Sequence, residues 1–213
     1  MRRIRIWDGP TRLFHWLLVL LIPLMWWTAE EERIDLHRPL GLVILALLLF
    51  RILWGLFGSS TARFANFLKG PRAVLDYLRG RATHEVGHNP LGALSVAAML
   101  GLLSLQVGLG LFSTDEDGLE EGPLAYLVSI DLAEEAADLH EDLFDVLLVL
   151  IGLHVAAILY YTIVKRQNLV GPMIGGSGDA PEGTPPMRAA PAWRLLLAAS
   201  VAGAVAWWIG SGL

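Results

Sequence analysis

Residues 36–57 read LHRPLGLVILALLLFRILWGLF, and this stretch decides the fold class of the 213-residue chain. Its formally charged residues, Arg38 and Arg51, lie near its two ends. A helix needs about 20 mainly apolar residues to cross a hydrocarbon core of ~30 Å. The stretch is therefore long enough to cross a membrane, and it lacks the polar face of a soluble helix.

Four further apolar blocks lie on either side of this stretch, over residues 13–29, 91–112, 140–164 and 193–209. The chain is 54% hydrophobic, which is more than an ordinary soluble domain contains. The short alternating segments of a membrane β-barrel are not visible. The sequence therefore predicts an all-α membrane protein, with a four-helix transmembrane bundle and a fifth, C-terminal transmembrane helix.

Composition also predicts the domain organisation. Residues 171–192 are rich in glycine and proline, which favours a flexible linker. We therefore expect a four-helix membrane domain over residues 1–170 and an additional transmembrane helix within residues 193–213. Between the second and third blocks, residues 71–78 predict a short interfacial helix with proline in its first turn.

Charge is segregated between alternate loops. The basic residues precede the first block, separate the second from the third and lie between the fourth and the fifth: Arg2, Arg3, Arg5, Arg12, Arg63, Lys69, Arg72, Arg79, Arg81, Lys165, Arg166 and Arg188. The acidic residues fill the opposite loops: Glu30, Glu31, Glu32, Asp35, Asp115, Glu116, Asp117, Glu120, Glu121, Asp131, Glu134, Glu135 and Asp138. Positively charged loops stay in the cytoplasm. We therefore expect a multi-pass protein of the bacterial inner membrane with a cytoplasmic N-terminus, and a periplasmic C-terminus if the fifth helix spans.

The absence of cysteine excludes iron–sulfur clusters, thiolate metal sites and the covalent attachment of c-type haem. Histidines remain as candidate ligands, and four of them lie in or at the ends of apolar blocks: His15, His37, His140 and His154. Ionisable residues inside a membrane are costly and indicate function by default. The alternative for any one of them is a hydrogen bond to a neighbouring helix.

The predicted orientation sorts these histidines by depth. His37 and His140 begin their blocks near the outer face, whereas His15 lies near the cytoplasmic face. His154 follows His140 by 14 residues, which is ~21 Å along a helix and close to four whole turns. We therefore expect two pairs, His37 with His140 and His15 with His154, each ligating a haem iron through two imidazoles. Two haems at these levels would carry electrons across the membrane.

Two arginines fit the same arrangement. Arg51 follows His37 by 14 residues on the same helical face, where it could pair with haem propionates, and Arg12 lies one turn before His15. The alternative for both is a side chain that extends to the membrane interface. The glycines of residues 91–112 would admit a macrocycle or simply allow close helix packing. His84 and His88, in or beside a cytoplasmic loop, are not expected to be axial ligands.

Five motifs together resemble the prokaryotic cytochrome b561 family, which includes the b-type cytochrome subunits of nickel–iron hydrogenases. They are WDGPTRLFHW at 7–16, LHRPLG at 36–41, GHNPLG at 87–92, LHE at 139–141 and GLHVAA at 152–157. The resemblance covers about residues 3–170. It implies a four-helix bundle with two b haems, ligated by His15, His37, His140 and His154, and electron exchange between quinone and a redox partner. The fifth helix departs from this pattern, and partner docking or a homodimer contact is open for it.

The function expected from these observations is electron transfer between the quinone pool and a periplasmic c-type cytochrome, or a dehydrogenase or hydrogenase subunit. An electron-transfer subunit is favoured over a stand-alone enzyme. The acidic outer loops would attract a basic partner. By family analogy, a quinone is expected near His88, Arg12 and Trp16. Membrane lipid is a further expected partner, and nucleic acid is not.

Two alternatives stay open. The first is a superoxide:quinone oxidoreductase, although the outer carboxylates would repel the superoxide anion and only Arg33 and Arg38 are basic on that side. The second is a transporter or scaffold whose histidines are merely polar contacts.

Overall fold

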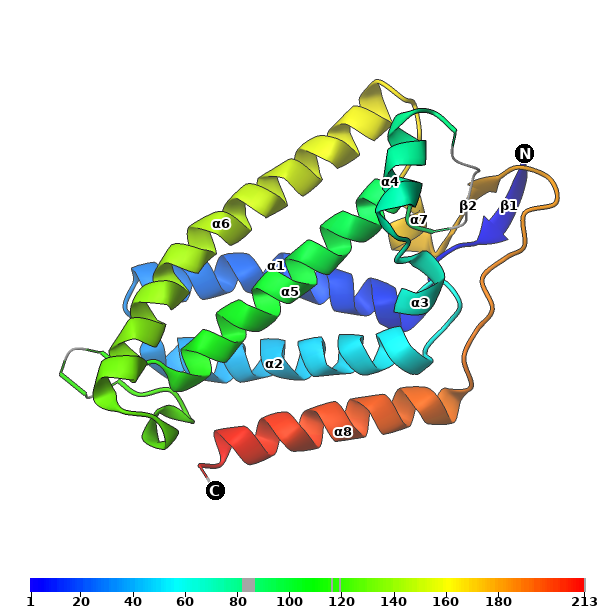
Figure 1. Ribbon diagram of the computed structural model, residues 1–213. Helices are drawn as coiled ribbons and strands as arrows, with labels where there is room; N and C mark the ends of the chain where they lie inside the picture. The colour runs from blue at the N-terminus through cyan, green and yellow to red at the C-terminus, as the bar shows by residue number, and fades with distance from the viewer. Residues whose placement is uncertain (82–86, 116, 119, 213) are drawn as a thin grey trace. The chain divides into compact units, whose positions relative to one another are not determined.

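The computed structural model describes residues 1–81, 87–115, 117–118 and 120–212. Within these ranges, five helices are long and apolar enough to cross a membrane (Figure 1). They are α1 (Gly9–Glu30), α2 (Ile34–Phe57), α5 (Pro90–Phe112), α6 (Ile130–Ile163) and α8 (Ala192–Gly210). These helices match the five apolar blocks, so the prediction of an all-α, multi-pass membrane protein is confirmed.

The chain forms two compact units. The first unit comprises Met1–His15, Arg51–Met99 and Leu150–Ala198, and the second comprises Trp16–Phe50, Leu100–Val149 and Ala199–Leu213. Each of the five long helices contributes a part to both units. The candidate histidines divide evenly, because His15 and His154 belong to the first unit and His37 and His140 to the second.

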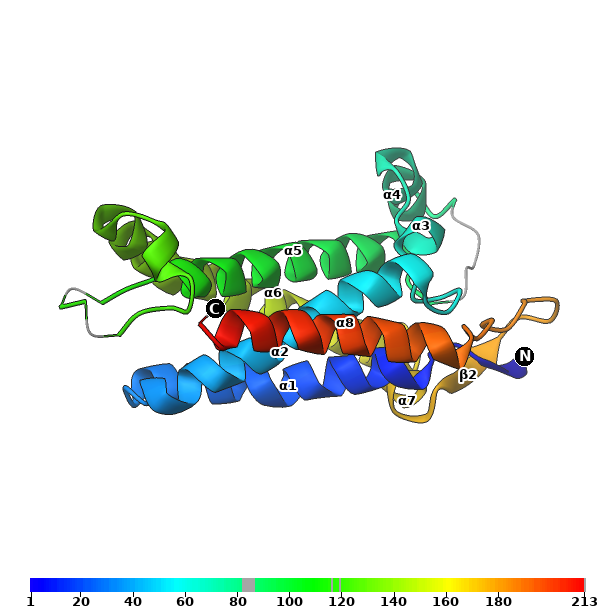
Figure 2. The ribbon, with the colours of Figure 1, turned by 90° about the horizontal axis from the view of Figure 1, so that it is seen from below.

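The first unit holds both strands and the short α-helices, while a short 3-10 helix, η1 (Ala125–Leu127), belongs to the second unit. Strand β1 (Arg2–Arg5) pairs antiparallel with β2 (Ser177–Ala180), so that Arg2 lies opposite Ala180 and Arg5 opposite Ser177. Helix α7 (Val170–Gly175) directly precedes β2. Helices α3 (Phe64–Phe67) and α4 (Pro71–Leu78) lie near the beginning of α5, and α4 runs crosswise to it (Figure 2). Helix α4 has the bounds that the sequence predicts.

The segment expected to be a flexible linker, residues 171–192, contains regular structure. Most of α7 and all of β2 fall inside it, and the Met187 amide donates a hydrogen bond to the Arg5 carbonyl at 2.9 Å. Gly176 has a φ of +81° and forms the turn between α7 and β2, a conformation that glycine adopts without strain. Glycine here therefore allows a tight turn. The predicted domain boundaries themselves stay predictions.

Helix α6 begins at Ile130, although the apolar pattern predicts its start at His140. Ser129 Oγ accepts a hydrogen bond from the Leu132 amide at 3.4 Å, and Asp131 in the first turn complements the helix dipole. The expectation of an acidic loop reaching to residue 139 is thus wrong for residues 130–139. Hydropathy detects only the membrane-crossing part of a helix, and this extension is polar.

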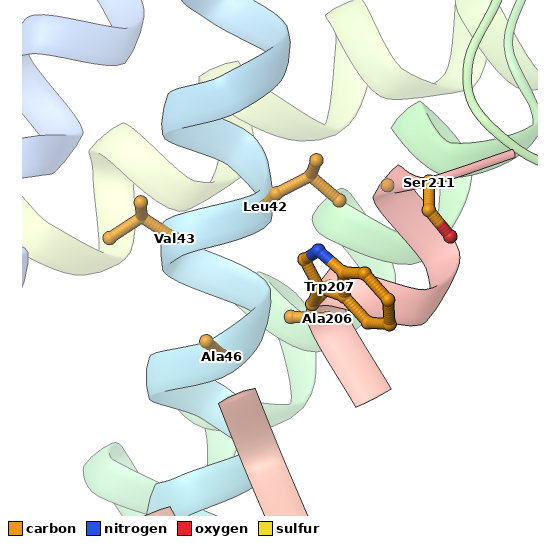
Figure 3. Close-up of a pocket in the computed structure, with 7 residues that line it drawn as sticks. Leu42, Val43, Ala46, Ala206, Trp207 and Ser211 are labelled. Carbon is orange, nitrogen blue, oxygen red and sulfur yellow. The ribbon is translucent and has the colours of Figure 1, made fainter. Parts of the chain in front are cut away.

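The fifth helix buries three alanines on one face. Ala198, Ala202 and Ala206 recur every four residues on one face of α8 and are all buried. In the second unit, a Cβ added to Gly210 would lie 2.5 Å from Leu42 Cδ1, so α8 closely approaches α2 there. Figure 3 shows an apolar pocket beside this contact, with Trp207 facing α2. Small residues permit such close helix packing in membranes.

Candidate functional site

In the second unit, α2 and α6 bring two histidines close together. The ring centres of His37 and His140 lie 6.2 Å apart, and the rings are inclined by 75°. Both histidines belong to membrane-crossing helices, where an imidazole without a role is costly. The structure thus brings together the two residues that the sequence pairs at the outer level.

A threonine fixes the orientation of His37. The hydroxyl of Thr28, a fully buried residue of α1, lies 3.0 Å from His37 Nδ1 and donates its hydrogen to the Met25 carbonyl at 2.8 Å. Because that hydroxyl has a single hydrogen, it accepts a hydrogen bond from His37 Nδ1. Nε2 of His37 then carries the free lone pair, which is the state that a metal ligand needs.

Helix α5 orients His140 in a similar way. Nδ1 of His140 lies 2.8 Å from the Gln106 carbonyl, and the Gln106 side chain donates to the His140 carbonyl at 2.7 Å. A carbonyl can only accept, so Nδ1 carries the proton and Nε2 is left with the lone pair. A Cβ added to Gly110 would lie 2.9 Å from His140 Cε1. Glycine is therefore required for α5 to approach the ring so closely.

The first unit contains the second pair. The ring centres of His15, on α1, and His154, on α6, lie 6.5 Å apart, with the rings inclined by 57°. This pair again joins the two residues that the sequence places at one level.

Both pairs have the separation that a six-coordinate metal between two imidazoles requires. Two metal–nitrogen bonds of about 2.0 Å, with about 1.1 Å from each nitrogen to its ring centre, give ~6 Å between ring centres. Among the described residues, no three His, Asp or Glu side chains gather into a metal site. The protein thus offers two ligands at each pair, and a macrocycle such as haem would supply the other four. The histidines fit haem, while their assignment as ligands stays a prediction.

Arg51 lies in a buried polar cluster of the first unit. Its guanidinium donates to the Ala62 carbonyl at 3.3 Å and lies 4.8 Å from the centre of the Phe64 ring. The nearby carboxylate of Asp8 accepts hydrogen bonds from the Trp54 indole at 2.9 Å and from the Thr11 amide. Arg51 is only 2% exposed, so protein encloses its side chain.

Arg12 contacts α7, while its predicted contact with haem or quinone stays a prediction. Its Nε donates to the Met173 carbonyl at 3.3 Å, and its Nη2 donates to the Ile174 carbonyl. These carbonyls belong to the end of α7, where backbone acceptors lack helical partners. The contact joins the beginning of α1 to α7 within the first unit. Trp16, the third residue predicted near quinone, belongs to the second unit and is 36% exposed.

His88 lies in the first unit between two aromatic rings. Its ring centre is 4.6 Å from that of Trp7 and 4.6 Å from that of Phe67. Nδ1 is buried without a hydrogen-bond partner among the described residues. Burial, with smaller effects from the charges of Arg51 and His154, lowers the pKa of His88 to about 3. His88 is therefore a neutral imidazole with an unused nitrogen. His84 lies outside the described residues.

Arg33 and Arg38, the two arginines predicted to lie on the outer side, are both paired in the second unit. Arg33 Nε lies 3.2 Å from Asp35 Oδ1, and Arg38 Nη2 lies 2.8 Å from Glu120 Oε2. Neither guanidinium is therefore an unneutralised positive charge.

The model of the prokaryotic cytochrome b561 family matches residues 6–176, which include all four paired histidines. The chain belongs to this family. It is thus a membrane b-type cytochrome that binds haem and takes part in electron transfer, as the sequence predicts. Comparison with curated proteins and with solved structures finds no match.

Sequence reasoning missed the residues that orient the histidines. Thr28 and Gln106 are single polar residues near the ends or within apolar blocks, and no motif identifies them. The signal available was their polarity inside candidate membrane helices, which is costly unless a partner is present. The contacts of Trp7 and Phe67 with His88 were also missed. Trp7 belongs to a quoted motif, but aromatic residues are common at membrane interfaces, and neither residue is thereby linked to His88.

Proposed function

We propose that this b561-family chain holds two b haems and carries electrons between membrane quinone and a redox partner at the periplasmic face. The partner would be a c-type cytochrome or a subunit of a dehydrogenase or hydrogenase. The observation that carries this proposal is the presence of two imidazole pairs, with ring centres 6.2 and 6.5 Å apart, on helices long enough to cross a membrane. The loop charges predict His15 and His154 near the cytoplasm and His37 and His140 near the periplasm.

Each bound haem would supply a reversible one-electron carrier. The protein's part is to hold the imidazoles in place and in one tautomer. Thr28 and the Gln106 carbonyl do this for His37 and His140. Arg51 has five N–H donors and donates to the Ala62 carbonyl, and we propose that it also binds a haem propionate.

Quinone is proposed to bind beside His88. A quinone presents carbonyl oxygens and a flat ring, and His88 offers an unused Nδ1 flanked by the rings of Trp7 and Phe67. Arg12 supports this region indirectly, because its guanidinium is occupied by the carbonyls of α7. Trp16 stays a prediction, as no described contact links it to His88.

The pairing of Arg33 with Asp35 and of Arg38 with Glu120 bears on the superoxide alternative. An anionic substrate needs a local positive potential, and these two guanidinium charges are neutralised. The beginning of α6 instead exposes Asp131, Glu135 and Asp138. This surface favours a basic protein partner over superoxide.

The test is electron transfer from a quinol to a basic c-type cytochrome by the reconstituted protein, measured at increasing ionic strength. We expect the rate to fall as salt rises, because screening weakens steering between exposed charges. The double substitution Glu135→Gln with Asp138→Asn should lower the rate at low salt and flatten this dependence. The matched control, Asp179→Asn with Glu182→Gln, removes two charges from the first unit and should change neither.

Two outcomes would refute the proposal. One is a salt-independent rate that the α6 substitutions leave unchanged. The other is reduction of quinone by superoxide at a rate far above that of any exchange with c-type cytochromes, which would establish the alternative function.

A further inference from the structure

Helix α4 is amphipathic and buries none of its eight residues. Val74, Leu75 and Leu78 lie on one side at helical spacing, and Leu75 and Leu78 are 49% and 65% exposed. Leu68, shortly before the helix, is 41% exposed. Such a cluster of exposed leucines on a short helix is unfavourable in water and indicates a surface that is covered by something else.

Basic residues border this apolar side. Arg72 and Arg79 lie seven residues apart and therefore on the same flank of α4, with Lys69 and Arg81 just beyond its ends. The acid within this stretch is Asp76. No described carboxylate lies within salt-bridge distance of Arg72 or Arg79. Their charges are thus available to an external anion.

The opposite flank anchors α4 to a membrane-crossing helix. The hydroxyl of Tyr77 lies 2.5 Å from that of Tyr161, near the end of α6, and Asn89 Nδ2 donates to Tyr161 at 3.5 Å. Burial and this hydrogen bond raise the pKa of Tyr77 to about 12, so the phenol stays protonated. The contact fixes α4 at the end of a membrane helix, crosswise to the beginning of α5 (Figures 1 and 2). This is the position and direction of a helix that lies in the membrane interface.

We propose that α4, with Arg72, Arg79 and Arg81, is a binding surface for anionic phospholipid. The leucines enter the boundary between headgroups and acyl chains, while the arginines contact lipid phosphates. A soluble protein partner fits less well, because the anchor to α6 holds this apolar side at the level of the membrane surface. The surface is separate from the histidine pairs, so the inference goes beyond the proposed electron transfer.

The test compares the full haem-loaded chain in nanodiscs of phosphatidylcholine alone and in discs that also contain phosphatidylglycerol. Hydrogen exchange of the α4 amides reports binding directly. We expect exchange at least tenfold slower in the discs with phosphatidylglycerol. Native mass spectrometry should find this lipid retained on the chain, with retention weakened about fivefold for each basic residue neutralised.

Variants identify the surface responsible. The triple substitution Arg72→Gln, Arg79→Gln, Arg81→Gln should abolish the lipid-dependent protection, and the corresponding triple substitution to Lys should keep it. The matched control, Arg2→Gln, Arg3→Gln, Arg5→Gln in β1, removes the same charge from the same unit and should leave protection intact. Haem content verifies folding of each variant.

If the α4 amides of the wild-type chain exchange at the same rate in both kinds of disc, the proposal is overturned, and no variant is needed for that conclusion. An equal loss of protection in the β1 control would also overturn it, because attraction would then be a property of the whole basic face. Protection that appears only when a soluble protein is added would assign the surface to that partner instead.

Discussion

The Gly110→Ala substitution perturbs one histidine pair in a defined way. The added Cβ would lie 2.9 Å from Cε1 and 3.1 Å from Nδ1 of His140. Carbon atoms in contact prefer a separation of about 3.5 Å or more, so the ring must retreat by roughly 0.6 Å. The hydrogen bond from Nδ1 to Gln106, at 2.8 Å, resists that movement.

A displacement of this size matters because metal ligands must be held within about 0.5 Å of their productive position. Overpacking typically costs about 1–3 kcal/mol, and 1.4 kcal/mol is tenfold in affinity. We therefore expect the haem between His37 and His140 to be retained roughly 5- to 150-fold less tightly. The haem between His15 and His154 should be unaffected.

To measure this loss, the protein is washed with apomyoglobin, which takes up released haem. The haem that remains per chain is then read from the reduced-minus-oxidised spectrum. The matched control is Gly108→Ala on the same helix. A Cβ added at Gly108 meets no atom within 4 Å. Because the two glycines are two residues apart, Gly108 points about 200° around the helix axis from Gly110. Full haem retention in Gly110→Ala, or an equal loss in Gly108→Ala, would refute the assignment of His140 as a ligand held against α5.

Three further predictions follow from single contacts. Thr28→Val removes the acceptor for His37 Nδ1 and should weaken haem retention at the His37–His140 pair 10- to 100-fold, roughly the usual effect of losing such a partner. The control, Thr11→Val, deletes a hydroxyl without a hydrogen-bond partner among the described residues and should leave haem retention unchanged. Arg12→Gln should release α7 and speed hydrogen exchange of residues 170–180 about tenfold. A changed haem spectrum without faster exchange would contradict this and indicate that Arg12 contacts the cofactor. Burial lowers the pKa of His88 to about 3 in the folded chain, whereas an unperturbed histidine has a pKa of about 6.5, so only the unfolded chain takes up its proton between these values. The melting temperature of the wild type should therefore fall more than that of His88→Gln as the pH drops from 7 to 4. Parallel curves for the two proteins would contradict the lowered pKa.

Much of the fold could be predicted because apolar blocks and loop charges are direct expressions of the membrane environment. The histidine pairs were accessible for the same reason, since helical rise and orientation assign a depth to each residue. The polar start of α6 was not accessible, because residues such as Asp131 and Glu134 are compatible with either a loop or a solvated helix. Its helical state depends on a local cap at Ser129 and on the burial of Ala133.

Contacts between segments far apart in the sequence were also beyond prediction. The sequence did not predict that the Met173 carbonyl in α7, 161 residues away, accepts a hydrogen bond from Arg12. The β1–β2 pairing likewise joins the N-terminus to a glycine-rich segment that composition alone describes as a linker. Thr28 and Gln106 become functional candidates only when their distances to the imidazoles are known.

The central claim is that four histidines hold two b haems. Haem and protein should be quantified in the purified wild-type chain and in His140→Ala and His154→Ala, each with its reduced-minus-oxidised spectrum. Two b haems per chain in the wild type and one in each variant, with different residual bands, is the result that this account predicts. A wild-type ratio near one, or no b-type band, would contradict it.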